Sequence, residues 1–334
     1  MTVHVPGSRP ALVVIGALNG RLPPGLETVA DRVAVQSVST ASELATVLPD
    51  ASIVLLWEFD STLLREHFDR APALRWVHVA GAGVDAVMTA EIASSDVVVT
   101  NARGVFNRSI AETVVAMMLV FVKDMLTTMA LQAQRTWLHR DTEMLAGQTA
   151  LIVGAGEIGR AIGRSLEALG VDVTGVATSE RYDEDLGLVR SAEDLDSLLP
   201  RADFVILVLP LTDLTRGIIG PEQLALMKTT ARLINVGRGQ LVDEPALIAA
   251  LRSGSIAGAG LDVFQTEPLP SASPLWAMPN VIVSPHMSAD FHGWLQALAN
   301  QFFDNLDRWL DGQPLRNVVD KKLGYVPGNP TQVA

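Results

Sequence analysis

The 334-residue sequence contains no cysteine, and this absence excludes disulfide bonds, thiolate nucleophiles and cysteine-ligated zinc sites. Cationic residues are also scarce, with 25 lysines and arginines against 37 acidic residues and a formal net charge of -12. Sequence-independent binding to nucleic acid needs a basic surface. We therefore expect no nucleic-acid partner, and no metal ion.

Long apolar runs are missing as well. The longest, residues 114–122, is far too short to cross a bilayer. A shorter run at residues 11–18 follows Arg9, but no cleavage-like site comes after it, so it predicts a first strand and not a signal peptide. We expect a cytoplasmic protein that does not bind membranes.

What the sequence does contain is a large apolar fraction, 49%, enough for the cores of two domains. Its first hundred residues alternate strand-like and helical patterns, which predicts an α/β layer with a parallel sheet. Residues 108–131 predict one long helix, with Ser109 and Glu112 as a capping box. The strand-like runs of this first part are residues 11–17, 33–38, 53–57, 76–80 and 97–100.

A glycine motif at residues 154–159 organises the rest of the chain. Gly154, Gly156 and Gly159 match G-x-G-x-x-G directly after a buried-type strand and before a helical pattern. The first glycine permits a tight turn, the second lets the backbone approach a pyrophosphate, and the third lets helix and strand pack closely. The context predicts a dinucleotide site with the phosphates at a helix N-terminus.

The strand after this motif ends without the acidic residue that usually binds the ribose hydroxyls of NAD. Thr178, Ser179 and Arg181 stand there instead. Hydroxyls and a guanidinium suit a 2′-phosphate, so we expect NADP to be preferred over NAD. The alternative is that Arg181 is a solvated loop residue and that Glu180 or Asp183 takes the acid's part.

Three further strand-like runs end in polar residues. Arg238 follows residues 233–236, Asp262 and Glu267 follow a run that starts at residue 259, and His286 follows residues 281–283. In open α/β sheets ligands bind outside the carboxyl ends of the strands, so these side chains can converge there.

These motifs, in this order, resemble the D-isomer-specific 2-hydroxyacid dehydrogenases over nearly the whole chain. The resemblance rests on AGAGVD at 80–85, GAGEIG at 154–159, PLTDLTRGIIG at 210–220, NVGRG at 235–239, LDVFQTEP at 261–268 and SPH at 284–286.

The resemblance implies that Arg238, Glu267 and His286 are catalytic and that amides around Ala82 and Gly83 bind the substrate carboxylate. It also implies a homodimer formed through the cofactor domain, by the helix near Ile110 and the segment around Trp137. The cofactor positions that it implies beside the three glycines are Glu157, Ile158, Pro210, Thr215, Val236 and Asp262, the last facing the nicotinamide amide.

The residue types suit the reduction of a 2-oxo acid. A histidine titrates in the useful pH range, so His286 is the expected general acid, or the base in oxidation. Glu267 would orient its ring and favour the protonated form, although a glutamate before a proline can also merely cap a turn. Arg238 can bind a carboxylate through two parallel hydrogen bonds and polarise the ketone.

The position of the glycine motif in mid-chain predicts the domain layout. We expect an α/β protein with two Rossmann-like domains, in which a central dinucleotide-binding domain, residues 103–289, is inserted in a smaller flavodoxin-like domain. The smaller domain, residues 1–102 with 290–334, would bind substrate and act as a lid.

Substrate and function class remain the most open questions. Trp57 follows the third strand and is expected either to contact substrate or to lie in the core. Asp290 departs from the small residues usual after the histidine and either alters the proton affinity of His286 or faces solvent. We expect glyoxylate, hydroxypyruvate or pyruvate as substrate, with a phosphoglycerate dehydrogenase-like enzyme or a nicotinamide-sensing corepressor-like protein as alternatives.

Overall fold

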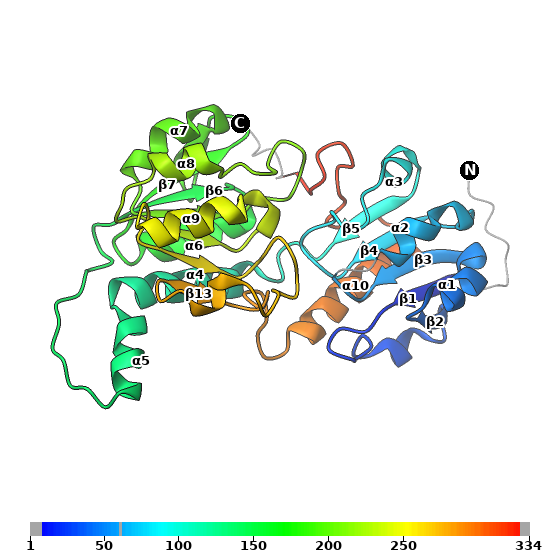
Figure 1. Cartoon of the computed structure of the whole chain (residues 1–334). Helices are drawn as coiled ribbons and strands as arrows, with labels where there is room; N and C mark the ends of the chain where they lie inside the picture. Colours follow the sequence, from blue (N-terminus) through cyan, green and yellow to red (C-terminus); the bar gives the residue numbers. More distant parts are fainter. Residues whose placement is uncertain (1–8, 60–61, 328–334) are drawn as a thin grey trace. The chain divides into compact units, whose positions relative to one another are not determined.

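The computed structural model describes residues 9–59 and 62–327. The chain forms two compact units (Figure 1). Unit 2 is the continuous stretch Phe106–Asp290, and unit 1 comprises the residues before it and after it. Each unit contains its own parallel sheet, so the expected α/β class with two Rossmann-like domains is confirmed.

The sheet of unit 1 has five parallel strands in the order β2-β1-β3-β4-β5, which is the flavodoxin-like order. The strands β1, β3, β4 and β5 are almost wholly buried, as expected of a parallel sheet covered on both faces, whereas the edge strand β2 is largely exposed. The strands are β1 (Ala11–Ile15), β2 (Ala34–Val38), β3 (Ala51–Leu56), β4 (Trp76–Val79) and β5 (Val98–Asn101).

The two faces of this sheet have different cores. One face packs Val13, Val54 and Val77 against leucines of the short helices. The other carries Trp76 and His78, whose rings lie beside Phe302 of the C-terminal helix. The helices of unit 1 are α1 (Ala41–Val47), α2 (Leu63–His67), α3 (Ala90–Ser94), α10 (Trp294–Leu310) and the 3-10 helices η1 (Leu26–Val29), η2 (Leu48–Asp50) and η3 (Phe68–Arg70).

The sheet of unit 2 has the order β13-β12-β11-β10-β6-β7-β9-β8, and all neighbouring strands are parallel except the β8–β9 pair at the edge. The strand that precedes the glycine motif, β6, lies at the centre, where the order of connections reverses. The strands are β6 (Thr149–Val153), β7 (Asp172–Ala177), β8 (Arg181–Asp183), β9 (Gly187–Ser191), β10 (Phe204–Leu207), β11 (Arg232–Asn235), β12 (Gly258–Leu261) and β13 (Val281–Val283).

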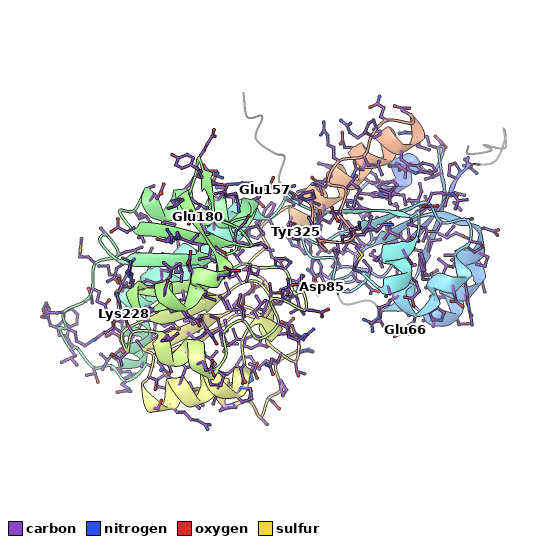
Figure 2. All side chains as sticks on the ribbon, turned by 90° about the horizontal axis from the view of Figure 1, so that it is seen from above. Glu66, Asp85, Glu157, Glu180, Lys228 and Tyr325 are labelled. Atoms are coloured by element: carbon purple, nitrogen blue, oxygen red, sulfur yellow. The ribbon has the colours of Figure 1, made fainter. Side chains whose placement is uncertain are left out.

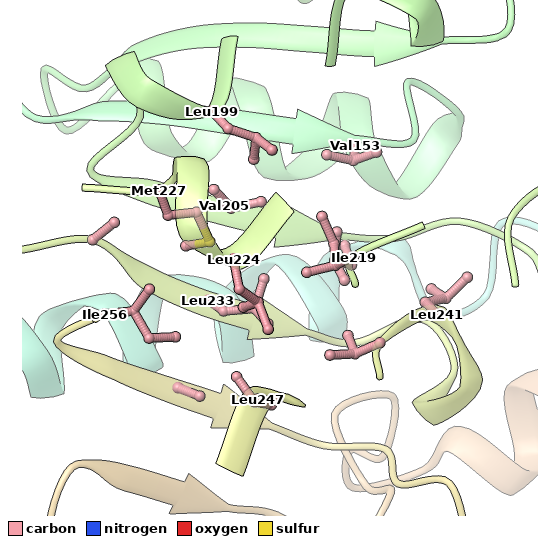
Figure 3. Packing of buried hydrophobic residues seen from close by; sticks show 14 of the residues in the cluster. Val153, Leu199, Val205, Ile219, Leu224, Met227, Leu233, Leu241, Leu247 and Ile256 are labelled. Carbon is pink, nitrogen blue, oxygen red and sulfur yellow. The ribbon is translucent and has the colours of Figure 1, made fainter. Parts of the chain in front are cut away.

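Helices cover both faces of this sheet. On one side α4 and α6 pack together, and on the other Leu224, Leu247 and Ile256 close a core over Val205 and Leu233 (Figure 3). The helices of unit 2 are α4 (Asn107–Val122), α5 (Met125–Ala133), α6 (Glu157–Glu167), α7 (Leu195–Leu198), α8 (Pro221–Leu226), α9 (Glu244–Ser253) and the 3-10 helices η4 (Ala192–Asp194), η5 (Leu199–Arg201), η6 (Gly239–Leu241) and η7 (Pro274–Ala277).

The prediction of one helix over residues 108–131 is wrong. Asp124 adopts a left-handed backbone with φ 47°, which ends α4 and starts α5 at a bend of 66°. The Arg140 guanidinium donates to the Asp124 carboxylate over 2.8 Å and holds this break. The capping box is wrong too, because Ser109 lies inside α4 and donates to the carbonyl of Ser288, while Glu112 pairs with Arg108.

The β8–β9 hairpin was not predicted from the sequence. Its strands have only three and five residues, and polar residues and a glycine lie between their apolar positions, a composition typical of a loop. The pairing of Arg181 with Val189 and of Tyr182 with Leu188 makes it a strand pair at the sheet edge.

No single helix in the described residues is long and apolar enough to cross a membrane. The bent pair α4 and α5 would pass such a test only if its two helices were counted together.

Candidate active site

The glycine turn after β6 has the geometry of a nucleotide site. Gly154 has φ 121°, and a Cβ there would lie 2.6 Å from the Val208 carbonyl oxygen. A Cβ on Gly159 would lie 2.0 Å from the Gly154 oxygen, whereas one on Gly156 would meet nothing within 4 Å. The first and third glycines are therefore required by the protein itself, and the second leaves space where a ligand can approach.

The helix that starts at this turn presents its first amides without a side-chain cap, within the part of the chain that the structure describes. Uncapped amides at a helix N-terminus favour an anion. Glu157, labelled in Figure 2, begins this helix, and its carboxylate accepts a hydrogen bond from Asn107 of α4 at 3.2 Å. The start of this helix is therefore suited to a phosphate, although its first side chain is acidic.

The segment after β7 places a cation beside the glycine turn. The Arg181 guanidinium donates to the Ala155 carbonyl at 2.8 Å, and Thr178 and Ser179 are exposed nearby in sequence. The two acids of this segment have other partners: Asp183 is buried and paired with Arg160 at 3.1 Å, and Glu180 lies 3.5 Å from Arg190 (Figure 2).

In the loop after β10, the Thr215 side chain forms hydrogen bonds within the loop itself. The Thr215 hydroxyl donates to the Pro210 carbonyl and accepts from the Thr212 amide, both at 2.8 Å. Its role is therefore to fix the loop shape, and this loop follows a strand adjacent to β6 at the carboxyl edge.

The loop after β11 is held by Asn235, whose side chain accepts from the Gly237 amide at 3.1 Å and donates to the Arg238 carbonyl at 2.9 Å. A Cβ on Gly239 would lie 1.9 Å from the Phe264 carbonyl carbon, so only glycine fits. Arg238 lies between Gly237 and Gly239, whose positions are fixed by these contacts. Arg238 is half-buried, and Val236, two residues earlier, is buried.

Glu267 uses its two oxygens for two partners. Oε2 lies 2.6 Å from Nδ1 of His286, and Oε1 accepts the Phe264 amide at 2.9 Å. The glutamate therefore both caps its own turn and holds the histidine. Burial opposes its ionisation, but these hydrogen bonds outweigh burial and keep the pKa of Glu267 below its ordinary value.

His286 has a left-handed backbone with φ 52°, which is uncommon for a residue with a side chain and costs about 1–3 kcal/mol. Its amide donates to the Asp262 carbonyl at 2.8 Å. The hydrogen bond that the ring donates to Glu267 raises the pKa of His286 above 6.5, against burial and the nearby Arg238 charge, which lower it. The ring is thus prepared to carry a proton near neutral pH.

Asp262 is fully buried, and both carboxylate oxygens accept hydrogen bonds from residues 284–288. In this structure its side chain is a fixed part of the histidine loop. Asp290 is half-buried, and burial together with the Asp262 charge raises the pKa of its carboxyl group. The expectation that Asp290 might simply face solvent is therefore not met.

The candidate carboxylate site lies in unit 1, in the turn after β4. The carbonyls of Gly81 and Ala82 accept hydrogen bonds from the Ala102 amide at 2.9 Å and from the Asn101 side chain at 2.5 Å. The amides of Ala82 and Gly83 donate to no partner within residues 9–59 and 62–327. The turn is fixed through its carbonyls and leaves amides for an anion.

Of the two positions expected for Trp57, the structure shows the one in the core. Its side chain is completely buried, and its indole N–H donates to the Arg21 carbonyl at 2.9 Å. Trp57 therefore lies in the core of unit 1, with its ring buried and its indole N–H hydrogen-bonded.

Sequence reasoning missed the residues that support the site: Asn101, Asn235 and Ser284. Each stands at or next to a strand end, and Asn235 and Ser284 also lie within two residues of a predicted site residue, which is the signal that could have found them. Among the described residues no group of three or more histidine, aspartate or glutamate side chains could hold a metal ion.

Comparison with known proteins places these features in one family. The family model described as D-isomer specific 2-hydroxyacid dehydrogenase, NAD binding domain, matches residues 115–288. A glyoxylate reductase of Korarchaeum cryptofilum is 34% identical over 264 residues, 77% of this chain and 80% of that protein. A D-3-phosphoglycerate dehydrogenase of Methanocaldococcus jannaschii is 32% identical over 299 residues. This match covers 88% of this chain but only 56% of that relative.

The fold agrees with solved structures. An NADPH-dependent glyoxylate/hydroxypyruvate reductase from Sinorhizobium meliloti, in complex with NADP and sulfate, superposes with a TM-score of 0.82 at 30% identity. The match covers 95% of this chain and all of that one. The resemblance inferred from the motifs is confirmed: the chain belongs to the D-isomer specific 2-hydroxyacid dehydrogenases, oxidoreductases that use a nicotinamide cofactor.

Proposed function

We propose that this enzyme reduces small 2-oxo acids of the glyoxylate, hydroxypyruvate or pyruvate type to D-2-hydroxy acids. The observation that carries the proposal is the 2.6 Å contact between Glu267 and Nδ1 of His286. That contact occupies Nδ1 and leaves Nε2 as the nitrogen that faces the substrate carbonyl. The names of the Korarchaeum and Sinorhizobium relatives support this class of substrate.

A reduced nicotinamide bound in unit 2 would supply the hydride that the carbonyl carbon accepts. His286 donates the proton that the carbonyl oxygen needs, and Glu267 stabilises the charged ring before the transfer. Arg238 binds the carboxylate and polarises the ketone through its planar guanidinium. In oxidation the neutral ring of His286 removes the proton from the hydroxyl group.

We assign substrate binding in part to unit 1, through the amides of Ala82 and Gly83, and the cofactor to unit 2. On this assignment residues 103–289 form the dinucleotide-binding domain, and residues 1–102 with 290–334 form the substrate domain and lid. The family model for an NAD binding domain, which lies within unit 2, supports the assignment of the cofactor.

The cofactor would be held at the carboxyl edge of the unit 2 sheet. The amides around Gly156 would bind the pyrophosphate, because the space beside that glycine is open. The loops that would surround the nicotinamide end include Pro210, Thr215, Val236 and Asp262.

We further propose that NADP is preferred over NAD. The guanidinium of Arg181 lies beside the glycine turn. The two acids that could bind the ribose hydroxyls of NAD instead, Asp183 and Glu180, are paired with other arginines. A 2′-phosphate would thus meet a cation and the hydroxyls of Thr178 and Ser179.

Steady-state oxidation of NADPH and NADH with glyoxylate, hydroxypyruvate, pyruvate and 3-phosphohydroxypyruvate tests these proposals together. Arg181→Ala should lower the preference for NADPH, measured as a ratio of kcat/KM, by about tenfold or more. Arg201→Ala is the matched control, since Arg201 lies at the opposite ends of the strands. A wild-type enzyme that favours NADH would contradict the role of Arg181 and preserve the reaction.

Two alternatives are separated by the same panel. Turnover with the phosphorylated acid alone would identify a phosphoglycerate dehydrogenase-like enzyme, as the match to the Methanocaldococcus protein allows. NADPH binding without turnover of any acid would favour a nicotinamide-sensing, corepressor-like protein.

A homodimer is proposed from the apolar surface of unit 2. Helix α5 has no buried residue and projects from the rest of unit 2, and the segment after it returns to the sheet along an outer path (Figure 1). Trp137 is 98% exposed there, and Met129 and Met144 are more than half exposed. Such a patch is typical of a protein interface. Light scattering should give twice the 35.7 kDa chain mass, and Trp137→Asp should shift it toward the monomer.

The cytoplasmic location and the absence of nucleic-acid and membrane partners stay predictions. Fractionation of cells that express the protein, and binding assays with DNA and anionic vesicles, would test them.

A further inference from the structure

The register of two strands brings Asp262 and Ser284 together. Leu261 of β12 pairs with Val283 of the parallel strand β13, so the next residue on each strand leaves the sheet at the same edge. The backbone pattern continues one step further, with the Ser284 amide donating to Leu261 and the His286 amide donating to Asp262, both at 2.8 Å. The Ser284 hydroxyl then reaches Oδ1 of Asp262 at 2.5 Å.

The chain after Ser284 turns around the Asp262 carboxylate. The amide of Met287 donates to Oδ1 at 2.9 Å, and the amide of Ser288 donates to Oδ2 at 3.0 Å. Because Asp262 is fully buried, it depends on these donors in place of water. His286, with its left-handed backbone, sits within this turn.

The donors to Asp262 are of two kinds. Met287 and Ser288 contribute amides that belong to the turn itself and move with it. The Ser284 hydroxyl comes from the residue that directly follows β13, so it joins the carboxylate to the end of the sheet. Two backbone hydrogen bonds, from the Ser284 and His286 amides, also tie the turn to the end of β12, and the Ser284 hydroxyl adds the side-chain donor that fixes the Asp262 carboxylate itself.

We propose that Ser284 is a positioning residue: its hydroxyl fixes the Asp262 carboxylate, and the carboxylate holds the turn that directs Nδ1 of His286 to Glu267. The inference rests on the proposed role of His286 as the proton donor. It gives Asp262 a task in the histidine loop that is separate from any contact with the cofactor.

The charged groups that act on His286 define the readout. Glu267 and Asp262 favour its protonated form and Arg238 opposes it. The charge of the protonated ring in turn favours the ionised form of Asp290. If the turn loosens, the strongest of these influences, the hydrogen bond to Glu267, weakens first. The pKa of His286 should then fall toward its ordinary value.

The test compares Ser284→Ala with Ser284→Thr, which keeps the hydroxyl, and with Ser253→Ala as a control on an exposed helix end. Histidine-ring NMR titration of the full-length protein, with His286 assigned through His286→Gln, measures the pKa without any turnover. In Ser284→Ala we expect this pKa to fall, and kcat to fall about tenfold with the KM for NADPH unchanged within about twofold. Ser284→Thr should restore both.

Three results would overturn the proposal: an unchanged His286 titration in Ser284→Ala, a Ser284→Thr variant as impaired as Ser284→Ala, or an equal effect of Ser253→Ala. A wild-type protein that turns over no 2-oxo acid would contradict the proposed function. The titration would still decide whether Ser284 positions His286, so the two failures can be told apart.

Discussion

Each unit has a histidine in or just after a strand of its sheet, and the pKa values of the two side chains are shifted in opposite directions. His78 lies within β4 of unit 1, fully buried, with Nδ1 2.8 Å from the Thr100 hydroxyl. Burial lowers its pKa to about 3. His286 lies beyond the end of β13 in unit 2, where Glu267 raises its pKa. The same residue type is kept neutral in one unit and is prepared for protonation in the other.

The place along the strand explains the difference. A side chain in mid-strand is covered by the layers above and below the sheet, and His78 there lies beside the rings of Trp76 and Phe302. Its Nε2 meets no hydrogen-bond partner among the described residues, so a charge would be unsatisfied. A side chain beyond a strand end meets loops, and loops can bring carboxylates to it.

The largest expected effect comes from removing His286, the histidine with the raised pKa. His286→Ala should lower kcat about 10²–10⁴-fold, because it removes the proton donor, and leave the Kd for NADPH within about twofold. Steady-state kinetics and fluorescence titration of NADPH measure the two quantities. His67→Ala, on a short helix of unit 1, should keep full activity. Equal losses in turnover and cofactor affinity would count against an acid–base role.

The pH dependence of catalysis sharpens the comparison. Reduction needs protonated His286, whose pKa is raised, so kcat/KM for reduction should stay level up to a pH above 6.5 and then decline. Oxidation needs the neutral ring and should rise over the same range. Glu267→Gln should move both limbs to lower pH and reduce turnover at pH 7 by about tenfold. Limbs that do not move would show that Glu267 does not set the pKa.

The smallest expected effect is on stability. Below pH 6.5 the unfolded state protonates His78 while the folded state, with a pKa of about 3, does not. The free energy of unfolding should therefore fall as pH falls from 6.5, by up to about 1.4 kcal/mol per pH unit. His78→Leu should flatten this dependence, measured by urea unfolding between pH 5 and 7.5 with tryptophan fluorescence.

His286 should act on stability with the opposite sign. Its raised pKa gives a stabilisation that is fully present below pH 6.5 and is lost as pH rises through the folded-state pKa. Because the ring is partly exposed, this contribution is smaller than that of His78. If the free energy of unfolding of His78→Leu fell below pH 6.5 as steeply as that of the wild type, the stability effect would not come from His78, and the contrast with His286 would be wrong.

Much of the fold could be predicted from local patterns. Short apolar runs bounded by glycine and polar residues marked all five strands of the unit 1 sheet to within two residues at each end. The glycine turn was equally local, since its three positions follow from one tight turn and one helix contact. The break at Asp124 was missed, because a left-handed residue held by Arg140 depends on a side chain 16 positions away.

The main residues of the candidate site could also be predicted from the sequence, but the contacts that support them could not. Arg238, Glu267 and His286 stand at strand ends, so parallel strands bring them to one edge of the sheet. The sequence could not tell that Trp57 is core, because a tryptophan after a strand suits a pocket and an interior equally well. It could not find Ser284 as a donor, because the contact depends on the register of β12 and β13.

The sequence by itself determined the order of strands and helices, the glycine turn and the types of side chain available for chemistry. These depend on periodicity and on backbone sterics, which act between near neighbours. Only the tertiary structure decided how each side chain behaves: His78 neutral, His286 with a raised pKa, Asp262 buried among amides. Burial and hydrogen-bond partners come from residues far apart in the chain, and they set the free energy of each charge.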